Sequence, residues 1–420
     1  MSVLYRLGIR LYGGLIWAAA PFVPKARAWV QGRKEWADRL AAFAEGNPSI
    51  VWMHCSSVGE FEDSRVVWEQ LRAAWPQTKF ALTFFSSSGY EHFIDKPVAD
   101  GIFYLPLDTR HNARRFLDLL QPQVVLFSRS DLWRNVLVEA RRRGLPSYLL
   151  GLRMDANSPF LKNSARSHFE ACFRAFTHIY AQNETTRQLL ESELGITAVS
   201  VVGNARIDRI ANAATTAPDF PRVKEFVGDH FCVIVGSSVS LEEVYALQLA
   251  TRPEFDPVRW LLVPHEIHRD ELKLRTLRLQ DQEALFTEDT PLKDTHRVLW
   301  IDTVGHLKHL YAYADLAIVG GGFDKIGIHS ILEPALYGLP IWFGPNHRNY
   351  PEALDLMALG GATVFESIEE LAAVVHQHLK EGVDPTLKSQ IKGYVRENTG
   401  ASTRTLEDLL SRHPELALKG

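Results

Sequence analysis

The feature that most constrains the fold is an alternation of short apolar, β-branched runs with longer amphipathic stretches. In the first half of the chain, the runs typical of strands are residues 50–54, 80–85, 101–105, 124–127, 147–150, 178–181 and 199–202. Between them, residues 62–74, 112–120 and 132–143 have the apolar spacing of helices. Strands that alternate with helices are typical of parallel sheets. The pattern therefore predicts an α/β domain.

The alternation is interrupted once, by the small residues and prolines of ANAATTAPDFP at 211–221. After it, the expected strands are residues 232–235, 260–263, 298–301, 316–319 and 339–343, with a short last strand at 363–365. A chain of 420 residues exceeds an ordinary single core. We therefore expect an N-terminal domain at 32–210, a linker at 211–222 and a C-terminal domain at 223–420. Two such halves can face each other across a cleft, because parallel sheets bind ligands beyond the carboxyl ends of their strands.

Composition and missing motifs argue against several classes of protein. With 46% hydrophobic and 23% charged residues, the chain is expected to fold rather than to be disordered. A net charge of −4 gives no basic field, so nucleic acid is not an expected partner. The three cysteines are far apart and lack CxxC spacing, which fits a reducing cytoplasm. The absence of GxGxxG, P-loop, GxSxG and HExxH motifs argues against dehydrogenases, kinases, esterases and zinc peptidases.

The N-terminal segment, residues 1–31, differs from the rest of the chain. Residues 3–23 are mostly apolar, and Arg6 and Arg10 interrupt them. The longest uncharged run, 11–24, is shorter than the roughly 20 residues that span a bilayer. A helix lying in the membrane interface suits this pattern, because its apolar side chains insert while its arginines meet anionic headgroups. A secretory signal and a core helix packed on its own domain are the alternatives.

Two expected strands are followed by the same Ser-x-x-Glu pattern, Ser57 to Glu60 and Ser330 to Glu333. A capping box, in which the two side chains satisfy backbone N–H groups at a helix start, explains both pairs without any function. At the second pair Pro334 would fall where a backbone donor is wanted, so that helix is expected to start a residue or two later.

The second strand exit also has features that suit a nucleotide. Glycines at 320–322 let a ligand approach the backbone, and a helix start offers N–H groups to a phosphate. His329 and Glu333 follow and would share one helical face if the helix begins early enough. A histidine can donate to phosphate oxygens, and a carboxylate can accept from ribose hydroxyls. A nucleotide sugar would use all of these groups, although a glycine run can also form a plain turn.

At the first exit, Glu60 is a candidate general base, since transfer to an alcohol requires removal of the hydroxyl proton. Arg129 and Arg206 each follow an expected strand and could meet the charge of a departing phosphate. For each arginine, a salt-bridged surface position is the simpler alternative. His265 and Glu266 follow another strand, where helix capping explains them equally well.

Eight segments resemble, in their order and spacing, the 3-deoxy-D-manno-octulosonic acid (Kdo) transferases. They are GRKEWADRL, WMHCSSVGE, LTFFSSSGYE, FYLPLDT, AQNE, VGNARIDR, LVPHEIH and VGGGFDKIGIHSILEPALYGLPIWFGPN, between residues 32 and 346. The closest resemblance is to the Bacteroidetes branch. It implies a GT-B glycosyltransferase, with two Rossmann-like domains that face each other across a cleft. The domain at 32–210 would bind the acceptor, and 223–420, with C-terminal helices, would bind the CMP-sugar.

The resemblance also implies roles for individual residues. Glu60 corresponds to the family's catalytic base, and Arg129 and Arg206 to its charged transition-state positions. Together with the residues noted above, the positions expected to hold the donor nucleotide are His265, Glu266, Val304, Gly305, His306, Gly321, His329, Ser330, Ile331, Leu332 and Glu333.

This chain departs from the family pattern at four places. Many members have glutamate where Arg129 stands, and glutamate is also common at the position of Asp131. The usual arginine-histidine pair is His265-Glu266 here, and the usual asparagine is Ser330. These departures bear on donor affinity and on the identity of the sugar.

The implied reaction is an inverting transfer of Kdo from CMP-Kdo to a lipid A precursor, lipid IVA, in lipopolysaccharide synthesis. The resemblance implies an enzyme at the cytoplasmic face of the inner membrane, either peripheral or anchored by its N-terminus, that needs no metal ion and no cofactor besides its donor. The absence of an Asp-x-Asp element agrees with this. A sugar-nucleotide epimerase or hydrolase on the same plan, and a non-catalytic glycosyltransferase-like binding protein, are the alternative hypotheses.

Overall fold

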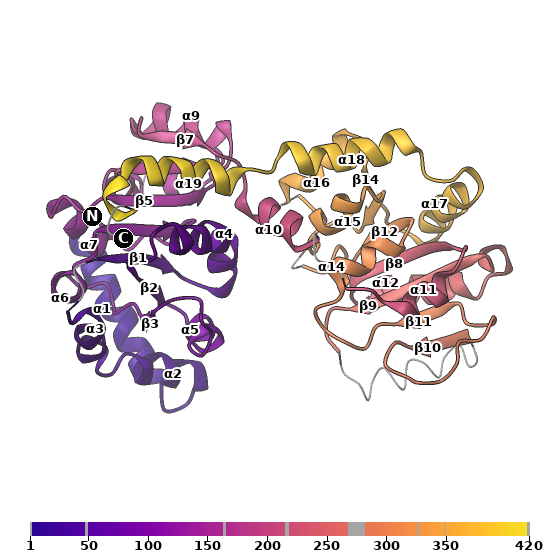
Figure 1. The fold of residues 1–420 in the computed structure, drawn as a ribbon, viewed down its shortest axis with the longest axis horizontal. Coiled ribbons are helices and arrows are strands. Elements are labelled where there is room, and N and C mark those ends of the chain that lie inside the picture. Colours follow the sequence, from indigo (N-terminus) through magenta and orange to yellow (C-terminus); the bar gives the residue numbers. More distant parts are fainter. Residues whose placement is uncertain are drawn as a thin grey trace. The chain divides into compact units, whose positions relative to one another are not determined.

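The computed structural model describes residues 2–46, 49–162, 165–214, 218–267, 282–325, 327–348 and 350–417 (Figure 1). The chain divides into two compact units, residues 1–209 with 399–420 and residues 210–398. Each unit contains one seven-stranded sheet, and every strand pair in both sheets is parallel. The predicted α/β class with two parallel-sheet domains is confirmed.

The first sheet has the strand order β3-β2-β1-β4-β5-β6-β7. Its strands are β1 (Ile50–Cys55), β2 (Lys79–Phe84), β3 (Gly101–Tyr104), β4 (Val124–Ser128), β5 (Ser147–Leu152), β6 (His178–Ala181) and β7 (Val199–Val201). The chain moves outward from β1 to β3 and then returns to place β4 beside β1. The order therefore reverses between β1 and β4, and open α/β sheets bind ligands at such a reversal.

Helices cover both faces of the first sheet (Figure 1). Along β1, Trp52 packs into one hydrophobic cluster and Met53 into the other, which is why the residues before His54 are all apolar. The helices of this unit are α1 (Ser2–Ala19), α2 (Pro24–Gly32), α3 (Trp36–Ala44), α4 (Val58–Ala74), α5 (Ser87–Phe93), α6 (Arg110–Leu120), α7 (Arg134–Arg142), α8 (Arg166–Phe173), α9 (Glu184–Leu194), α19 (Ala401–Arg412) and α20 (Pro414–Ala417). Helix α10 (Ala205–Ala214) carries the chain out of the first unit.

The second sheet has the order β10-β11-β9-β8-β12-β13-β14, which reverses between β8 and β12. Its strands are β8 (Phe231–Ser238), β9 (Val258–Pro264), β10 (Glu283–Leu285), β11 (Val298–Trp300), β12 (Leu316–Val319), β13 (Ile341–Phe343) and β14 (Ala362–Val364). The helices are α11 (Pro221–Val227), α12 (Ser240–Ala250), α14 (Leu307–Leu310), α15 (Leu332–Tyr337), α16 (Pro351–Ala358), α17 (Ile368–Glu381) and α18 (Pro385–Glu397). The sequence interpretation missed only β10 among these strands, because its three residues lie in the polar stretch QDQEALFTED.

The C-terminal residues 399–420 were expected in the second domain, but they belong to the first unit. Leu409 of α19 is buried in one of the two clusters beneath the first sheet. Asp208 fixes the start of α19 by accepting hydrogen bonds at 2.6 Å from the backbone N–H groups of Gly400 and Ser402. The second unit therefore ends at residue 398, where no domain boundary was predicted.

The expected linker at 211–222 overlaps two helices. Helix α10 continues to Ala214 and α11 begins at Pro221, while residues 215–217 lie outside the described residues. Ile207 and Ile210 are buried on one side of α10, and alanine is the best helix former. The alanine-rich composition that suggested a linker therefore forms the end of a helix.

Helix α1 packs on the first unit by one face only. The Tyr5 hydroxyl donates to Asp108 at 2.7 Å, which anchors the helix. The opposite face exposes between 59% and 69% of the side chains of Leu4, Leu7, Leu11 and Leu15. Helix α1 is thus packed on its own domain, as one alternative for this segment expected, but it leaves a leucine face exposed. No single helix in the described ranges is long and apolar enough to cross a membrane, and α1 and α2 pass that test only as a pair bent by 118°.

We expect Leu409→Ala to destabilise the first unit by about 3 kcal/mol, because it opens a cavity in a closed core. Hydrogen exchange followed by mass spectrometry should show faster exchange in β1 and β4 and little change in β8 and β12. Glu407→Ala, at an exposed position of the same helix, is the control. Faster exchange confined to the second unit would contradict the assignment of residues 399–420 to the first.

Candidate active site

Glu60 lies at the carboxyl end of β1, in the first turn of α4. Ser57 is the N-cap of that helix, and its hydroxyl accepts a hydrogen bond from the Glu60 N–H at 3.4 Å. The Glu60 carboxylate turns back and accepts a hydrogen bond from the Ser56 N–H at 2.5 Å. The capping interpretation of the Ser-x-x-Glu pattern is therefore confirmed here. It does not remove the chemical interpretation, since the carboxylate remains at the strand exit.

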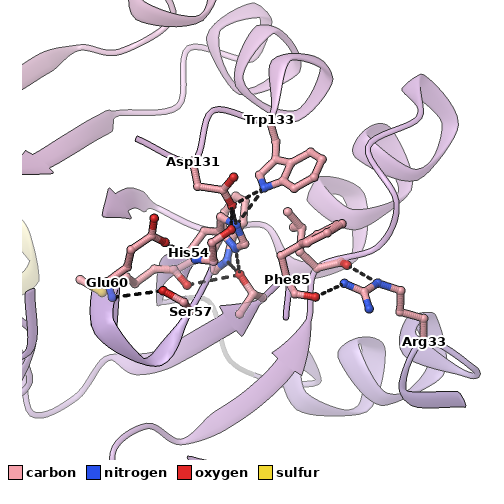
Figure 2. A network of polar contacts seen from close by, with 12 residues as sticks. Arg33, His54, Ser57, Glu60, Phe85, Asp131 and Trp133 are labelled. Atoms are coloured by element: carbon pink, nitrogen blue, oxygen red, sulfur yellow. Dashed lines mark hydrogen bonds and ion pairs between the residues drawn. The ribbon is translucent and has the colours of Figure 1, made fainter. Parts of the chain in front are cut away.

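A buried network of polar side chains lies beside Glu60 (Figure 2). Asp131, just after β4, accepts hydrogen bonds from the Ser56 hydroxyl and, at 2.6 Å, from the Trp133 indole N–H. Its Oδ2 atom also lies 2.9 Å from Nε2 of His54, which is fully buried. On the other side of that ring, Nδ1 lies 2.9 Å from the Thr83 hydroxyl. Neighbouring strands β1, β2 and β4 thus supply one connected network.

The environment moves the pKa values of the two carboxyl groups apart. Burial, and then the charge of Asp131, raises the pKa of Glu60 to about 7, against the opposing effects of the Ser56 N–H and Arg129. Burial also acts to raise the pKa of Asp131, but the hydrogen bonds from His54, Ser56 and Trp133 outweigh it and hold that pKa below its usual value. Separated pKa values in neighbouring carboxyl groups are typical of acid–base sites.

Arg129 is held in a left-handed backbone conformation, with a φ of 62°, directly after β4. Its Nε lies 3.0 Å from the Asp63 carboxylate on α4. Burial raises the pKa of Asp63, and the charges of Arg129, Arg206 and Arg209 oppose that rise. Glu60, Arg129 and Arg206 therefore lie near one another around α4, and their catalytic roles stay a prediction. The side chain of Arg129 is 37% exposed and ion-paired, as the salt-bridged alternative expected.

A small cavity of about 20 Å³ adjoins this ion pair. Its lining includes Asp63, Arg129, Gln182 and Asn204, at the ends of β4, β6 and β7 and the start of α4. A space of this size holds about one water molecule. The cavity is therefore too small for a sugar, but it leaves the Arg129 side chain beside a solvent-sized space.

In the second unit, the glycine run at 320–322 is required by close packing of the backbone. A Cβ on Gly320 would lie 2.1 Å from the Ser237 carbonyl oxygen, and one on Gly322 would lie 2.4 Å from the Gly344 nitrogen. Gly321 has a φ of 89°, and its N–H donates to the buried Glu242 carboxylate at 2.9 Å. The Gly321 N–H is therefore already bound to a side chain of the same unit.

The helix after the glycines starts later than Ser330. Helix α15 begins at Leu332, with Ile331 as a cap that makes no side-chain hydrogen bond. Ser330 is therefore not the N-cap, as Pro334 led us to expect. His329 precedes the helix, so the expectation that it shares a helical face with Glu333 is wrong. The buried Ser330 hydroxyl has no hydrogen-bond partner among the residues that the structure describes.

The other predicted donor residues fall into separate groups. The rings of His265 and His329 stack with their centroids 4.2 Å apart, and burial, with the charge of His265, lowers the pKa of His329. The charge of Glu333 contributes to the raised pKa of the buried Tyr311, so these two residues are neighbours. His306 packs against Phe220, with ring centroids 5.2 Å apart.

For three further predicted donor positions, the structure gives the solvent exposure and the backbone conformation. Glu266 and Gly305 are exposed, and Val304 is 79% exposed. Gly305 has a φ of 87°. These positions stay predictions as nucleotide contacts. Within the described ranges, no three His, Cys, Asp or Glu side chains are grouped to hold a metal ion; that the reaction needs none also stays a prediction.

Sequence reasoning missed several residues of the site. His54 could have been recognised from the sequence, since it is a titratable residue inside the otherwise apolar run IVWMHC. Asp131 was noted only as a departure from the family pattern. Its place beside Glu60, like that of Trp133, follows from the pairing of β4 with β1, which brings the carboxyl ends of these strands together. The contact of Glu242 with Gly321 had no signal, since it joins residues 79 positions apart.

Comparison with known proteins agrees with the resemblance to Kdo transferases. Residues 34–209 match the family model of 3-deoxy-D-manno-octulosonic-acid transferase (Kdo transferase). The chain is 28% identical to the Kdo transferase of Chlamydia trachomatis over 316 residues, which is 72% of each chain. It is 24% identical to the Kdo transferase of Haemophilus influenzae over 408 residues, 91% of this chain and 92% of the relative. The chain is a homologue of the Kdo transferases. The closer likeness to the Bacteroidetes branch stays a prediction.

Solved structures show the fold that this Kdo transferase homologue shares. The UDP-GlcNAc 2-epimerase from Neisseria meningitidis aligns with a TM-score of 0.60 at 14% identity, over 86% of this chain and 100% of the epimerase. The calicheamicin glycosyltransferase CalG4 aligns with a TM-score of 0.50 at 12% identity, over 87% of this chain and 98% of that chain. The GT-B fold is therefore common to glycosyltransferases and epimerases. At such low sequence identities the likeness shows a shared fold and not a shared function.

We expect Gly322→Ala to destabilise the second unit by about 2 kcal/mol, since its Cβ would collide with backbone that has no room to move. Chemical denaturation should show the loss. Gly393→Ala, in the interior of α18, is the matched control: the nearest atom to its Cβ is 3.9 Å away, so this change should be neutral or slightly stabilising. Equal stability of the two variants would contradict the packing role of the glycine run.

Proposed function

We propose that this protein is a Kdo transferase that moves Kdo from CMP-Kdo to a hydroxyl of a lipid A precursor. The observation that carries the proposal is the position of Glu60. It lies at the reversal of strand order, in the unit that matches the Kdo transferase family, with its pKa raised to about 7. A carboxylate with a pKa near the working pH is suited to take up a proton from a hydroxyl.

In the proposed reaction Glu60 removes the proton of the acceptor hydroxyl. The oxygen forms a bond to the anomeric carbon of Kdo while the bond from that carbon to the phosphate oxygen breaks. The proton stays on Glu60, and CMP leaves with the bonding electrons. Arg129 and Arg206 supply positive charge near Glu60, and Asp63 on α4 orients Arg129 at 3.0 Å. Their charge would stabilise the anionic transition state.

For the donor, we propose the strand ends of the second unit. The stacked rings of His265 and His329 and the buried hydroxyl of Ser330 are polar groups able to contact phosphate or sugar oxygens. Glu333, on the first turn of α15, would accept hydrogen bonds from the ribose hydroxyls. Gly321, with its N–H bound to Glu242, would act by permitting close approach instead of by donating.

We also propose that the protein lies on the cytoplasmic face of the inner membrane through α1. The exposed leucines at positions 4, 7, 11 and 15 follow helical spacing and form one apolar stripe. Phe22 is 84% exposed at the end of the helix, and Arg10, Lys25 and Arg27 are exposed nearby. An apolar stripe with basic residues beside it is typical of helices that lie in the interface of an anionic membrane.

Glu60→Gln should lower kcat for transfer by about 10²- to 10⁴-fold, because the amide cannot take up the acceptor proton. CMP binding, measured by calorimetry, should be unchanged, because the proposed nucleotide contacts are in the other unit. The assay uses freshly made CMP-Kdo and a lipid A precursor, with product analysis by mass spectrometry. Glu69→Gln, at an exposed position of the same helix, is the control. Turnover of Glu60→Gln at the rate of the unchanged protein would exclude Glu60 as the base.

The double substitution Leu7→Glu, Leu11→Glu should weaken binding to vesicles of anionic phospholipid at least about tenfold, since each leucine contributes about 1.5 kcal/mol or more when buried. Vesicle co-sedimentation measures this. Leu354→Glu, at a leucine that is 47% exposed in the second unit, should leave binding unchanged. If both proteins bind equally well, α1 is not the membrane contact.

A further inference from the structure

We propose that Asp131 is a positioning residue for the base: held by His54, Ser56 and Trp133, its carboxylate fixes Glu60 and sets the pH range over which Glu60 can accept a proton. The inference rests on the role proposed above for Glu60. The connecting element is Ser56, which touches both carboxylates. Its N–H donates to Glu60 at 2.5 Å, and its hydroxyl donates to Asp131.

Asp131 is held in place from three sides. The Oδ2 atom that receives the Ser56 hydroxyl also accepts from the Trp133 indole at 2.6 Å and lies 2.9 Å from the buried His54 ring. Trp133 is itself packed on Phe85, with ring centroids 4.3 Å apart (Figure 2). A carboxylate with three polar partners around one oxygen stays ionised, because each of them favours the charged form.

Burial is the largest effect against the ionisation of Glu60, and Asp131 is the charged group that opposes it most strongly. Arg129, from the loop after β4, acts in the opposite direction and favours the ionised form. The nearby Cys55 thiol has a pKa raised well above its usual value by burial, so it carries no charge at neutral pH. Burial of Glu60 and the negative charge of Asp131 together outweigh Arg129 and the two backbone N–H groups of Ser56 and Ser57.

This arrangement predicts a specific pH dependence. Glu60 acts as a base only when ionised, and its pKa is raised to about 7, so the rate should rise with pH through neutrality. Asp131→Asn removes a neighbouring negative charge, which lowers the pKa of Glu60 and moves the acid limb of the rate profile to lower pH. A residue that served only the fold would lower the rate at every pH without moving that limb.

The experiment compares kcat/KM between pH 5 and 9 for the unchanged protein, Asp131→Asn and Asp131→Glu, with CMP-Kdo and a lipid A precursor. The unchanged protein should lose about tenfold between pH 8 and pH 6. For Asp131→Asn, the kcat/KM at high pH should be lower, and the midpoint of the acid limb should move to lower pH by on the order of one unit. Asp131→Glu keeps the charge and should keep the midpoint. Asp118→Asn is the matched control, because this carboxylate on α6 is 65% exposed and is paired with Arg143.

A second measurement needs no substrate. Infrared difference spectra collected during a pH titration detect the carboxyl band that is missing from Glu60→Gln, and the midpoint of that band should be lower in Asp131→Asn. An unshifted midpoint in a folded Asp131→Asn protein overturns the inference. A shifted infrared midpoint without transfer by the unchanged protein supports the coupling of Asp131 and Glu60 and refutes the proposed function instead.

Discussion

The parallel pairing of β4 beside β1 is the constraint on which the candidate site depends. The two strands are separated in sequence by β2, β3 and the helices between them, yet their carboxyl ends lie side by side. Glu60 follows one strand and Asp131 follows the other, so their carboxyl groups meet within reach of a single serine. Apolar side chains that fill both faces of β1 keep this edge fixed. The chemistry at the edge is therefore a consequence of how the sheet is ordered.

Much of the fold was predictable because its signals are local. Runs such as the one at Ile50–Cys55 are long and apolar enough to be strands, and strands with helices between them leave few other topologies. The candidate base was also predictable, since Ser57 and Glu60 make a local pattern. The return of residues 399–420 to the first unit was not, because it depends on contacts such as those of Asp208 with Gly400, which no sequence period reveals.

The second unit shows a different limit of sequence interpretation. A glycine run after a strand suggests an approach for phosphate, but in this chain the first and third glycines are needed because β8 and the loop at Gly344 come too close for a side chain. The second donates to Glu242, a residue whose position could be known only from the three-dimensional structure. The local pattern located the glycine run, while its internal contacts decided which atoms of that segment are open to a ligand.

The return of the chain makes the second unit an insertion within the first. During synthesis, residues 210–398 leave the ribosome before the helices that complete the first core, α19 and α20. The inserted unit can therefore fold while the sheet of β1 to β7 still exposes the surface that Leu409 will cover. Until α19 packs on the sheet, the first unit exposes apolar surface of the kind that makes partly folded chains prone to aggregation.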